Sequence, residues 1–148
     1  MMTNQHPSLP FLQVFNESGI DIPVIEHDLQ RLIEIIKEKE HVSFELLEVV
    51  YVDEEEIVRV NKEYLNRDYV TDIISFRYDE DDSNSPIEGT LYCCAQRINE
   101  QAVEFESPTK QEFERIFIHG VLHLIGYDDQ RPSDKQKMTE LENYYLGQ

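Results

Sequence analysis

The sequence predicts a single α+β domain in which a small mixed β-sheet packs against helices. Segments with the apolar period of helices and segments rich in β-branched and aromatic residues intermix without strict βαβ alternation. The length of 148 residues suits one domain, and a hydrophobic content of 40% is sufficient for a core. No internal repeat or linker divides the chain. We therefore expect one domain over residues 11–148, preceded by a disordered start over residues 1–10.

The first half of the chain alternates between strand-like and helix-like segments. Residues 11–18 are typical of a short strand, and residues 24–40 carry apolar side chains at helical spacing. The β-branched and aromatic run 43–52 predicts a second strand. Asp53 and Glu56 then have the spacing of a capping box, which predicts that another helix begins there.

The middle of the chain is predicted to form two strands and a short helix. Residues 73–78 have the composition of a buried strand, and Gly89 introduces a strand over residues 90–95. The acidic run 79–86 separates these strands. It lacks the spaced ligands of an EF-hand loop, so a solvated loop tip is favoured over a calcium site. Residues 96–105 then indicate a short helix.

Two helices are predicted to complete the chain. The longer helix covers residues 109–125, and Gly126 is a natural helix stop. The last helix covers residues 133–146, with Ser133 expected as its N-cap. This arrangement places the histidine pair of the sequence in the final turns of the longer helix.

Composition limits the function classes. The net charge of −18 aids solubility but opposes nucleic-acid binding, because that affinity rests on Lys and Arg beside phosphates. A local cationic patch can still exist within this sum. No apolar run approaches the roughly 20 residues that cross a bilayer, and the start lacks the features of a secretory signal. We therefore expect no membrane partner and a cytoplasmic protein.

The two cysteines, Cys93 and Cys94, are adjacent in the sequence. Neighbours on a strand point to opposite faces, so this pair neither bridges easily nor chelates an ion together. The pair matches no zinc or redox spacing. We interpret both as small apolar residues in a reducing compartment.

The stretch IHGVLHLIGYDDQ contains the candidate metal ligands. His119 and His123 are four residues apart, which puts both imidazoles on one helix face. Neutral imidazole suits zinc, and a catalytic zinc commonly takes three protein ligands and a water. The helix stop would let the following chain fold back, so either Asp128 or Asp129 is a candidate third ligand. Gly120 occupies the position of the glutamate base in the H-E-x-x-H protease motif, which weakens a peptidase interpretation.

These residues resemble the YbeY-type rRNA maturation factors, a family of metal-dependent hydrolases. The family motif H-G-x-L-H-L-x-G-Y-D-H corresponds to HGVLHLIGYDD here, with Asp129 in place of the third histidine. The stretch VNKEYLNRDYVTDIISFRY and the segment GTLYCCAQRI match the family upstream, in the same order. The resemblance therefore implies one metal site formed by His119, His123 and Asp129. It also implies a zincin-like site at the end of the long helix.

Three departures from the family pattern bear on the chemistry. Aspartate at position 129 is a competent zinc ligand, but a carboxylate favours manganese and other oxygen-preferring ions more than imidazole does. The family arginine falls on Leu65, and Arg67 is the candidate replacement as the catalytic cation. Arg59 and Lys62, on the preceding helix, are further candidates. Thr90 stands where the family usually has aspartate.

The resemblance implies a zinc-dependent endoribonuclease specific for single strands, acting in 16S rRNA 3′-end maturation and ribosome quality control. Its implied partner is rRNA on the small ribosomal subunit. Because the chain is so acidic, we expect basic ribosomal proteins to assist this encounter. Two alternatives stay open: a non-catalytic assembly factor stabilised by its metal, and a metallohydrolase acting on another phosphoester.

Overall fold

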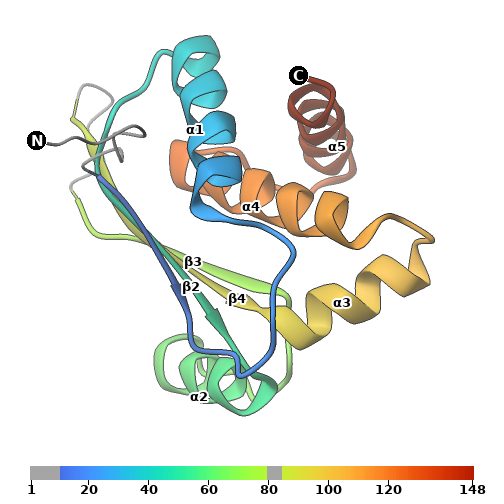
Figure 1. Ribbon diagram of the computed structural model, residues 1–148. Coiled ribbons are helices and arrows are strands. Elements are labelled where there is room, and N and C mark those ends of the chain that lie inside the picture. The colour runs from blue at the N-terminus through green and yellow to red at the C-terminus, as the bar shows by residue number, and fades with distance from the viewer. Residues whose placement is uncertain (1–10, 80–84) are drawn as a thin grey trace, which may run out of the picture.

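The computed structural model describes residues 11–79 and 85–148, and these residues form four strands and five helices (Figure 1). The prediction for residues 1–10 lies outside the described residues. The elements are β1 (Leu12–Asn16), α1 (Glu26–Glu40), β2 (Phe44–Val52), α2 (Glu54–Leu65), β3 (Ile73–Arg77), β4 (Ile87–Cys94), α3 (Ala95–Glu104), α4 (Thr109–Ile125) and α5 (Pro132–Leu146).

The strands form one mixed sheet in the order β1-β2-β4-β3. The pairs β1–β2 and β2–β4 are parallel, whereas β3 pairs antiparallel with β4. Helices α1 and α4 cover one face of this sheet, and α2 lies against the other (Figure 1). The single-domain α+β architecture with a small mixed sheet is therefore confirmed.

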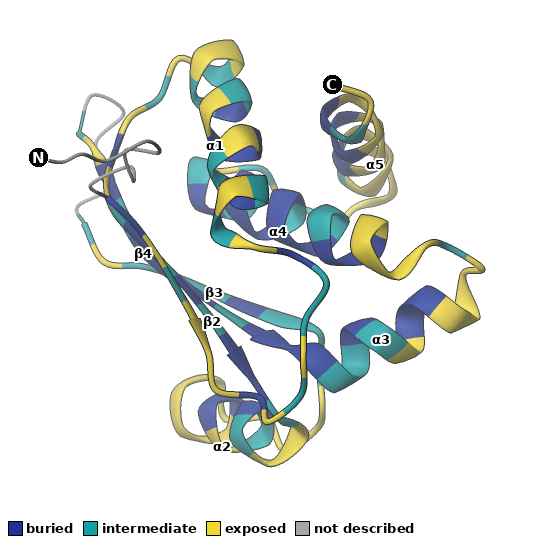
Figure 2. Cartoon of the chain, in the orientation of Figure 1, coloured by how far each residue is buried: buried dark blue, intermediate teal, exposed yellow. Residues whose placement is uncertain are grey.

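Helix α4 is the central helix of the fold. It packs against α1, α3, α5 and the strands β3 and β4, and its ribbon is buried along most of its length (Figure 2). Its approach to the sheet requires glycine at position 120, because a Cβ there would lie 2.5 Å from Cδ1 of Ile73 and 3.0 Å from Cδ2 of Leu91. The helix that carries both histidines is thus fixed by the core of the protein.

The two adjacent cysteines confirm the alternation expected of a strand. Cys93 belongs to the core between the sheet and the helices α1, α4 and α5, whereas Cys94 belongs to the smaller core under α2. Both thiols are free and buried, and burial raises the pKa of each thiol above its ordinary value. Both are therefore packing residues, as the sequence indicated.

Four local predictions were wrong. The strand predicted from residue 90 begins at Ile87, so Gly89 lies inside β4. Helix α5 begins at Pro132 with Arg131 as its N-cap, so Ser133 is not the cap. Proline is favoured at the first helical position, because the N–H that it lacks would have no partner within the helix. Strand β3 is only partly buried. Asp79 is not part of a solvated tip but forms an ion pair with Arg77. Residues 80–84 of the acidic run lie outside the described residues.

Candidate metal centre

The candidate metal centre lies at the C-terminal end of α4. His119 and His123 lie on its last two turns, and Gly126 ends the helix with φ of 128°. The N–H groups of Gly126 and Tyr127 both donate to the carbonyl of Leu122, which closes the helix end. Because glycine tolerates this positive φ, the chain can turn sharply and bring the two following aspartates back towards the histidines.

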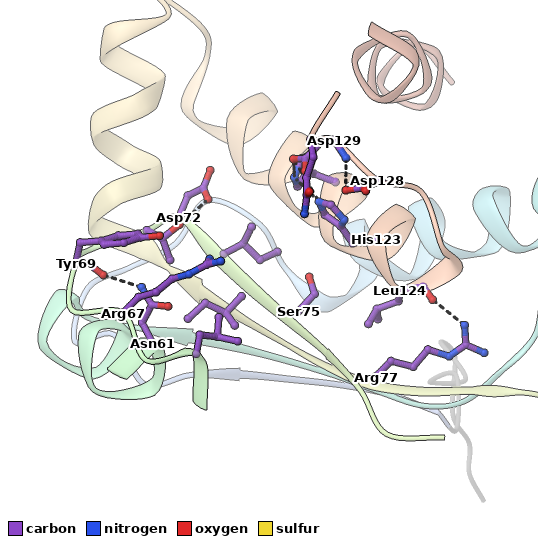
Figure 3. A pocket seen from close by; sticks show the side chains of 16 residues that line it. Asn61, Arg67, Tyr69, Asp72, Ser75, Arg77, His123, Leu124, Asp128 and Asp129 are labelled. Atoms are coloured by element: carbon purple, nitrogen blue, oxygen red, sulfur yellow. Dashed lines mark hydrogen bonds and ion pairs between the residues drawn. The ribbon is translucent and has the colours of Figure 1, made fainter. Parts of the chain in front are cut away.

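Three donor atoms converge at this point, and Asp129 supplies the third (Figure 3). The Nε2 atoms of His119 and His123 are 3.1 Å apart, and Oδ2 of Asp129 lies 3.3 Å and 3.4 Å from them. Donors about 2.1 Å from a tetrahedral zinc ion are about 3.4 Å from one another, so this triangle has the size that one such ion requires. Asp128 accepts a hydrogen bond from the Asp129 N–H, 2.7 Å away, and is not part of the triangle.

A buried glutamate contacts one of the histidines at the ring nitrogen that faces away from the other two donor atoms. Oε2 of Glu142, on α5, lies 2.6 Å from Nδ1 of His119, and Glu142 is only 7% exposed. The other carboxylate oxygen accepts a hydrogen bond from Arg115 at 3.0 Å. Since a carboxylate only accepts, the proton of the neutral imidazole is held on Nδ1, and the Nε2 lone pair is free to bind an ion.

The charges around His119 change its proton affinity. Burial lowers the pKa of His119, but the hydrogen bond and negative charge of Glu142, together with Asp129 and Asp72, outweigh this effect and raise the pKa above the ordinary value. The environment therefore favours a positive charge at this position. A proton and a divalent cation both satisfy it, and the three convergent donors fit the cation.

A hollow of about 530 Å³ opens beside the triad. His123 and Asp129 lie on one side of it, and the loop after α2, with Arg67 and Tyr69, lies on the other (Figure 3). Strand β3 contributes Ser75 to the lining between these two sides. The donors are partly accessible, with side-chain exposures of 21–37%. A substrate that enters this hollow can therefore reach an ion held by the triad.

Arg67 reaches the hollow because the loop that carries it is anchored to α2. Asn66 adopts a left-handed conformation, with φ of 57°, at the C-cap of this helix. The Arg67 N–H donates to the carbonyl of Asn61, and the Asn61 side-chain amide donates to the carbonyl of Tyr69 at 3.0 Å. Asn61 is 1% exposed, so the loop is held on a buried residue.

Among the described residues, Arg67 is also the arginine whose side chain forms no ion pair. Within residues 11–79 and 85–148, each other arginine forms an ion pair with a carboxylate, whereas no ion pair includes Arg67. Arg59, a further candidate from the sequence, is bound to Glu56 and Glu63, and neither Arg59 nor Lys62 lines the hollow. The geometry therefore favours Arg67 over both. Its catalytic role stays a prediction.

Sequence reasoning missed the part of the site that comes from distant elements. Glu142 was interpreted only as a residue of the last helix, and nothing in its local pattern indicates that α5 passes behind His119. Thr90, where the family resemblance led us to expect aspartate, donates to Glu48 at 3.0 Å and does not line the hollow. No helix within the described residues is long and apolar enough to cross a membrane.

The fold and the site together define a class of small α+β proteins in which three side chains at the end of a buried helix could hold one metal ion. The sequence profile of the family Endoribonuclease YbeY matches residues 13–148. An endoribonuclease YbeY of Chloroherpeton thalassium is 39% identical over 122 residues, which cover 82% of this chain and 84% of that protein. One from Chlorobium limicola is 37% identical over 136 residues, which cover 92% and 91%. The chain belongs to the endoribonuclease YbeY family.

A solved structure agrees with this assignment. The solution structure of TM1509 from Thermotoga maritima superposes with a TM-score of 0.62 at 27% sequence identity. The match covers 92% of this chain and 87% of that chain. The similarity therefore extends over nearly the whole chain.

Proposed function

We propose that this protein is a zinc-dependent endoribonuclease that cuts single-stranded rRNA of the small ribosomal subunit in the cytoplasm. One observation carries the proposal: His119, His123 and Asp129 converge on one side of an open hollow, and the guanidinium of Arg67, which forms no ion pair within the described residues, lies on the other. The relatives bear the name endoribonuclease, and this name supports the reaction class.

The residues of the chain have distinct tasks in this reaction. His119, His123 and Asp129 would hold the ion, which when bound lowers the pKa of a water to about 7 and acts as a Lewis acid. Glu142 keeps the Nε2 lone pair of His119 turned towards the ion site. Arg67 donates its N–H groups to the phosphate, whose charge grows as the bond to the leaving oxygen breaks. We assign no residue as general base.

The packing of α4 opposes a peptidase. A glutamate at position 120, as H-E-x-x-H proteases require, would place its Cβ 2.5 Å from Cδ1 of Ile73. A side chain of that size would push the helix away from the sheet. The hollow therefore lacks the carboxylate base that peptide hydrolysis uses in this motif, whereas phosphoester cleavage with Arg67 is compatible with the residues present.

The substrate and partners belong to the same proposal. We propose a role in 16S rRNA 3′-end maturation and in ribosome quality control, as family membership suggests. The net charge of −18 repels free RNA. We therefore infer that the protein acts on assembled particles, where basic ribosomal proteins compensate for this repulsion. Tight binding of naked RNA at physiological salt would contradict this inference.

The decisive experiment compares cleavage of a single-stranded RNA, casein and a model phosphodiester by the zinc-loaded protein. We expect the protein to cleave the RNA but neither casein nor the model phosphodiester, and to lose this activity when a chelator is added. We expect His123→Ala to lose both the activity and the bound zinc. Metal binding without cleavage of any substrate would instead indicate an assembly factor. Cleavage of the phosphodiester but not RNA would indicate a different phosphoester hydrolase. Unchanged zinc content in His123→Ala would refute the ligand assignment.

A further inference from the structure

The wall of the hollow opposite the triad carries large apolar groups next to Arg67. Leu65 and Tyr69 both line the hollow, although they are 39% and 53% exposed. Their neighbours in the lining are mostly polar, among them Asn61, Thr71 and Asp72. Apolar groups exposed together at the edge of a polar site are typical of ligand-binding surfaces, so this wall is suited to a flat, apolar part of a substrate.

Tyr69 is free to bind such a group. Two other exposed tyrosines use their rings within the protein: Tyr64 packs edge-on against Phe76, and Tyr144 packs against Tyr145. In the described part of the chain, the Tyr69 ring packs against no aromatic ring and its hydroxyl has no hydrogen bond. Only its main-chain carbonyl is bound, by the Asn61 side chain.

The backbone that presents Tyr69 is nevertheless held in place. The two hydrogen bonds to Asn61, one from the Arg67 N–H and one to the Tyr69 carbonyl, anchor the loop on both sides of Asp68. Because Asn61 is buried, solvent competes weakly for these bonds. The ring is therefore displayed on a fixed loop, which lowers the entropy lost when a ligand stacks on it.

We propose that Leu65 and Tyr69 form a subsite for an unpaired nucleobase, next to the phosphate bound by Arg67. This inference rests on the proposed function, because it concerns the same RNA strand. Stacking on an aromatic ring is tolerant of base identity, since every base has a π-face. A base within a duplex is already stacked and paired, so only a single strand can supply it. The subsite thereby gives a physical reason for single-strand specificity.

The test uses a short single-stranded RNA that contains 2-aminopurine, whose fluorescence falls when the base stacks. Zinc-loaded protein is titrated to high concentration at a salt concentration that screens the repulsion between the acidic protein and the RNA. We expect quenching by the parent and by Tyr69→Phe, which keeps the ring. In Tyr69→Leu the quenching is lost and the affinity falls roughly 5- to 100-fold. Tyr78→Leu is the matched control, because Tyr78 is 58% exposed but does not line the hollow.

The outcomes separate this subsite from the nuclease proposal. The subsite is overturned if quenching persists in Tyr69→Leu. It is also overturned if the parent protein does not quench the fluorescence, whether or not it binds the RNA. Quenching that depends on Tyr69 without any cleavage overturns the nuclease and leaves the subsite standing. Where cleavage occurs, Tyr69→Leu should raise KM more than it lowers kcat. An RNA with an abasic residue at the stacked position should be cut equally by the parent and Tyr69→Leu.

Discussion

Nδ1 of His119 lies 2.6 Å from Oε2 of Glu142, and this contact connects the candidate metal ligand to the last helix. Arg115 holds the other oxygen of the same carboxylate at 3.0 Å and also donates to Asn143 at 2.8 Å. The imidazole is therefore fixed by a chain of hydrogen bonds through the buried Glu142 rather than by α4 alone. The orientation of one metal ligand thus depends on how α5 packs.

Replacing Glu142 should weaken metal binding without removing a ligand. In Glu142→Gln, the fixed tautomer and the negative charge behind His119 are lost, and such changes typically lower metal affinity about 10- to 100-fold. Zinc affinity is measured by competition with a chromophoric chelator. Glu140→Gln, an exposed residue on the same helix, should bind zinc as the parent does. Equal affinities for Glu142→Gln and the parent would mean that Glu142 only packs the helices.

Arg67→Ala should slow RNA cleavage and leave the metal in place. The guanidinium lines the hollow but does not belong to the triad, so its loss removes charge stabilisation on the order of 10²-fold in rate. Single-turnover cleavage and elemental analysis measure the two properties separately. Arg59→Ala is the control, since Arg59 is bound by two glutamates away from the hollow. A rate for Arg67→Ala equal to that of the parent would remove Arg67 from the reaction.

The sequence predicted the features of this site that depend on local geometry. The spacing of His119 and His123 fixes their common helix face, and Gly126 ends the helix because of a backbone conformation that glycine adopts easily. Asp53 likewise caps α2, as its spacing from Glu56 indicated. All three depend on residues a few positions apart. Sequence pattern therefore predicted the helix, its end and the common face of the two histidines.

Features that depend on packing between distant elements were not predictable from the pattern. Glu142 reaches His119 across 23 positions, and its role follows from the crossing of α4 and α5. Helix geometry alone left Asp128 and Asp129 open as the third ligand, because single-residue propensities do not determine the turn after Gly126, and only the family resemblance selected Asp129. Arg77 donates to the carbonyl of Leu124 at 3.0 Å, 47 positions away, and so ties β3 to the end of α4.

The close approach of α4 to the sheet can be tested at position 120. In Gly120→Ala, alanine contributes about 1 kcal/mol of helix propensity, but overpacking typically costs about 1–3 kcal/mol. The added Cβ would lie 2.5 Å from Cδ1 of Ile73, so the steric cost should exceed the gain in helix propensity. The free energy of unfolding should therefore fall by about 1 kcal/mol. Urea unfolding measures this change. Gly147→Ala, with no contact closer than 3.5 Å, should not be destabilising.

Asp79 should make stability depend on pH in the acidic range. The hydrogen bonds from Arg77 and from the Glu88 N–H lower its pKa to about 2, compared with about 3.9 in an unfolded chain. A lowered pKa means that its contribution is complete above about pH 4 and is lost as the pH falls towards 2.

Asp79→Asn should therefore lower the free energy of unfolding by about 1–2 kcal/mol at pH 7. The difference between this variant and the parent should shrink between pH 4 and pH 2. Urea unfolding at several pH values provides the measurement, and Glu63→Gln, from an exposed ion pair, serves as the control. A difference that stays constant down to pH 2 would show that the carboxylate charge is not responsible.

The aspartate at position 129 should set the choice of metal. Oδ2 of Asp129 completes the triangle with the two imidazoles, and carboxylate oxygen favours manganese more than imidazole nitrogen does. Asp129→His replaces the oxygen with a nitrogen and removes a negative charge. The ratio of the manganese to the zinc dissociation constant should therefore rise, by roughly tenfold or more. Titration of both ions into the metal-free protein measures this ratio. Asp128→His should leave it unchanged, because Asp128 lies outside the triangle, and a ratio that is the same in Asp129→His and the parent would show that Asp129 is not a ligand.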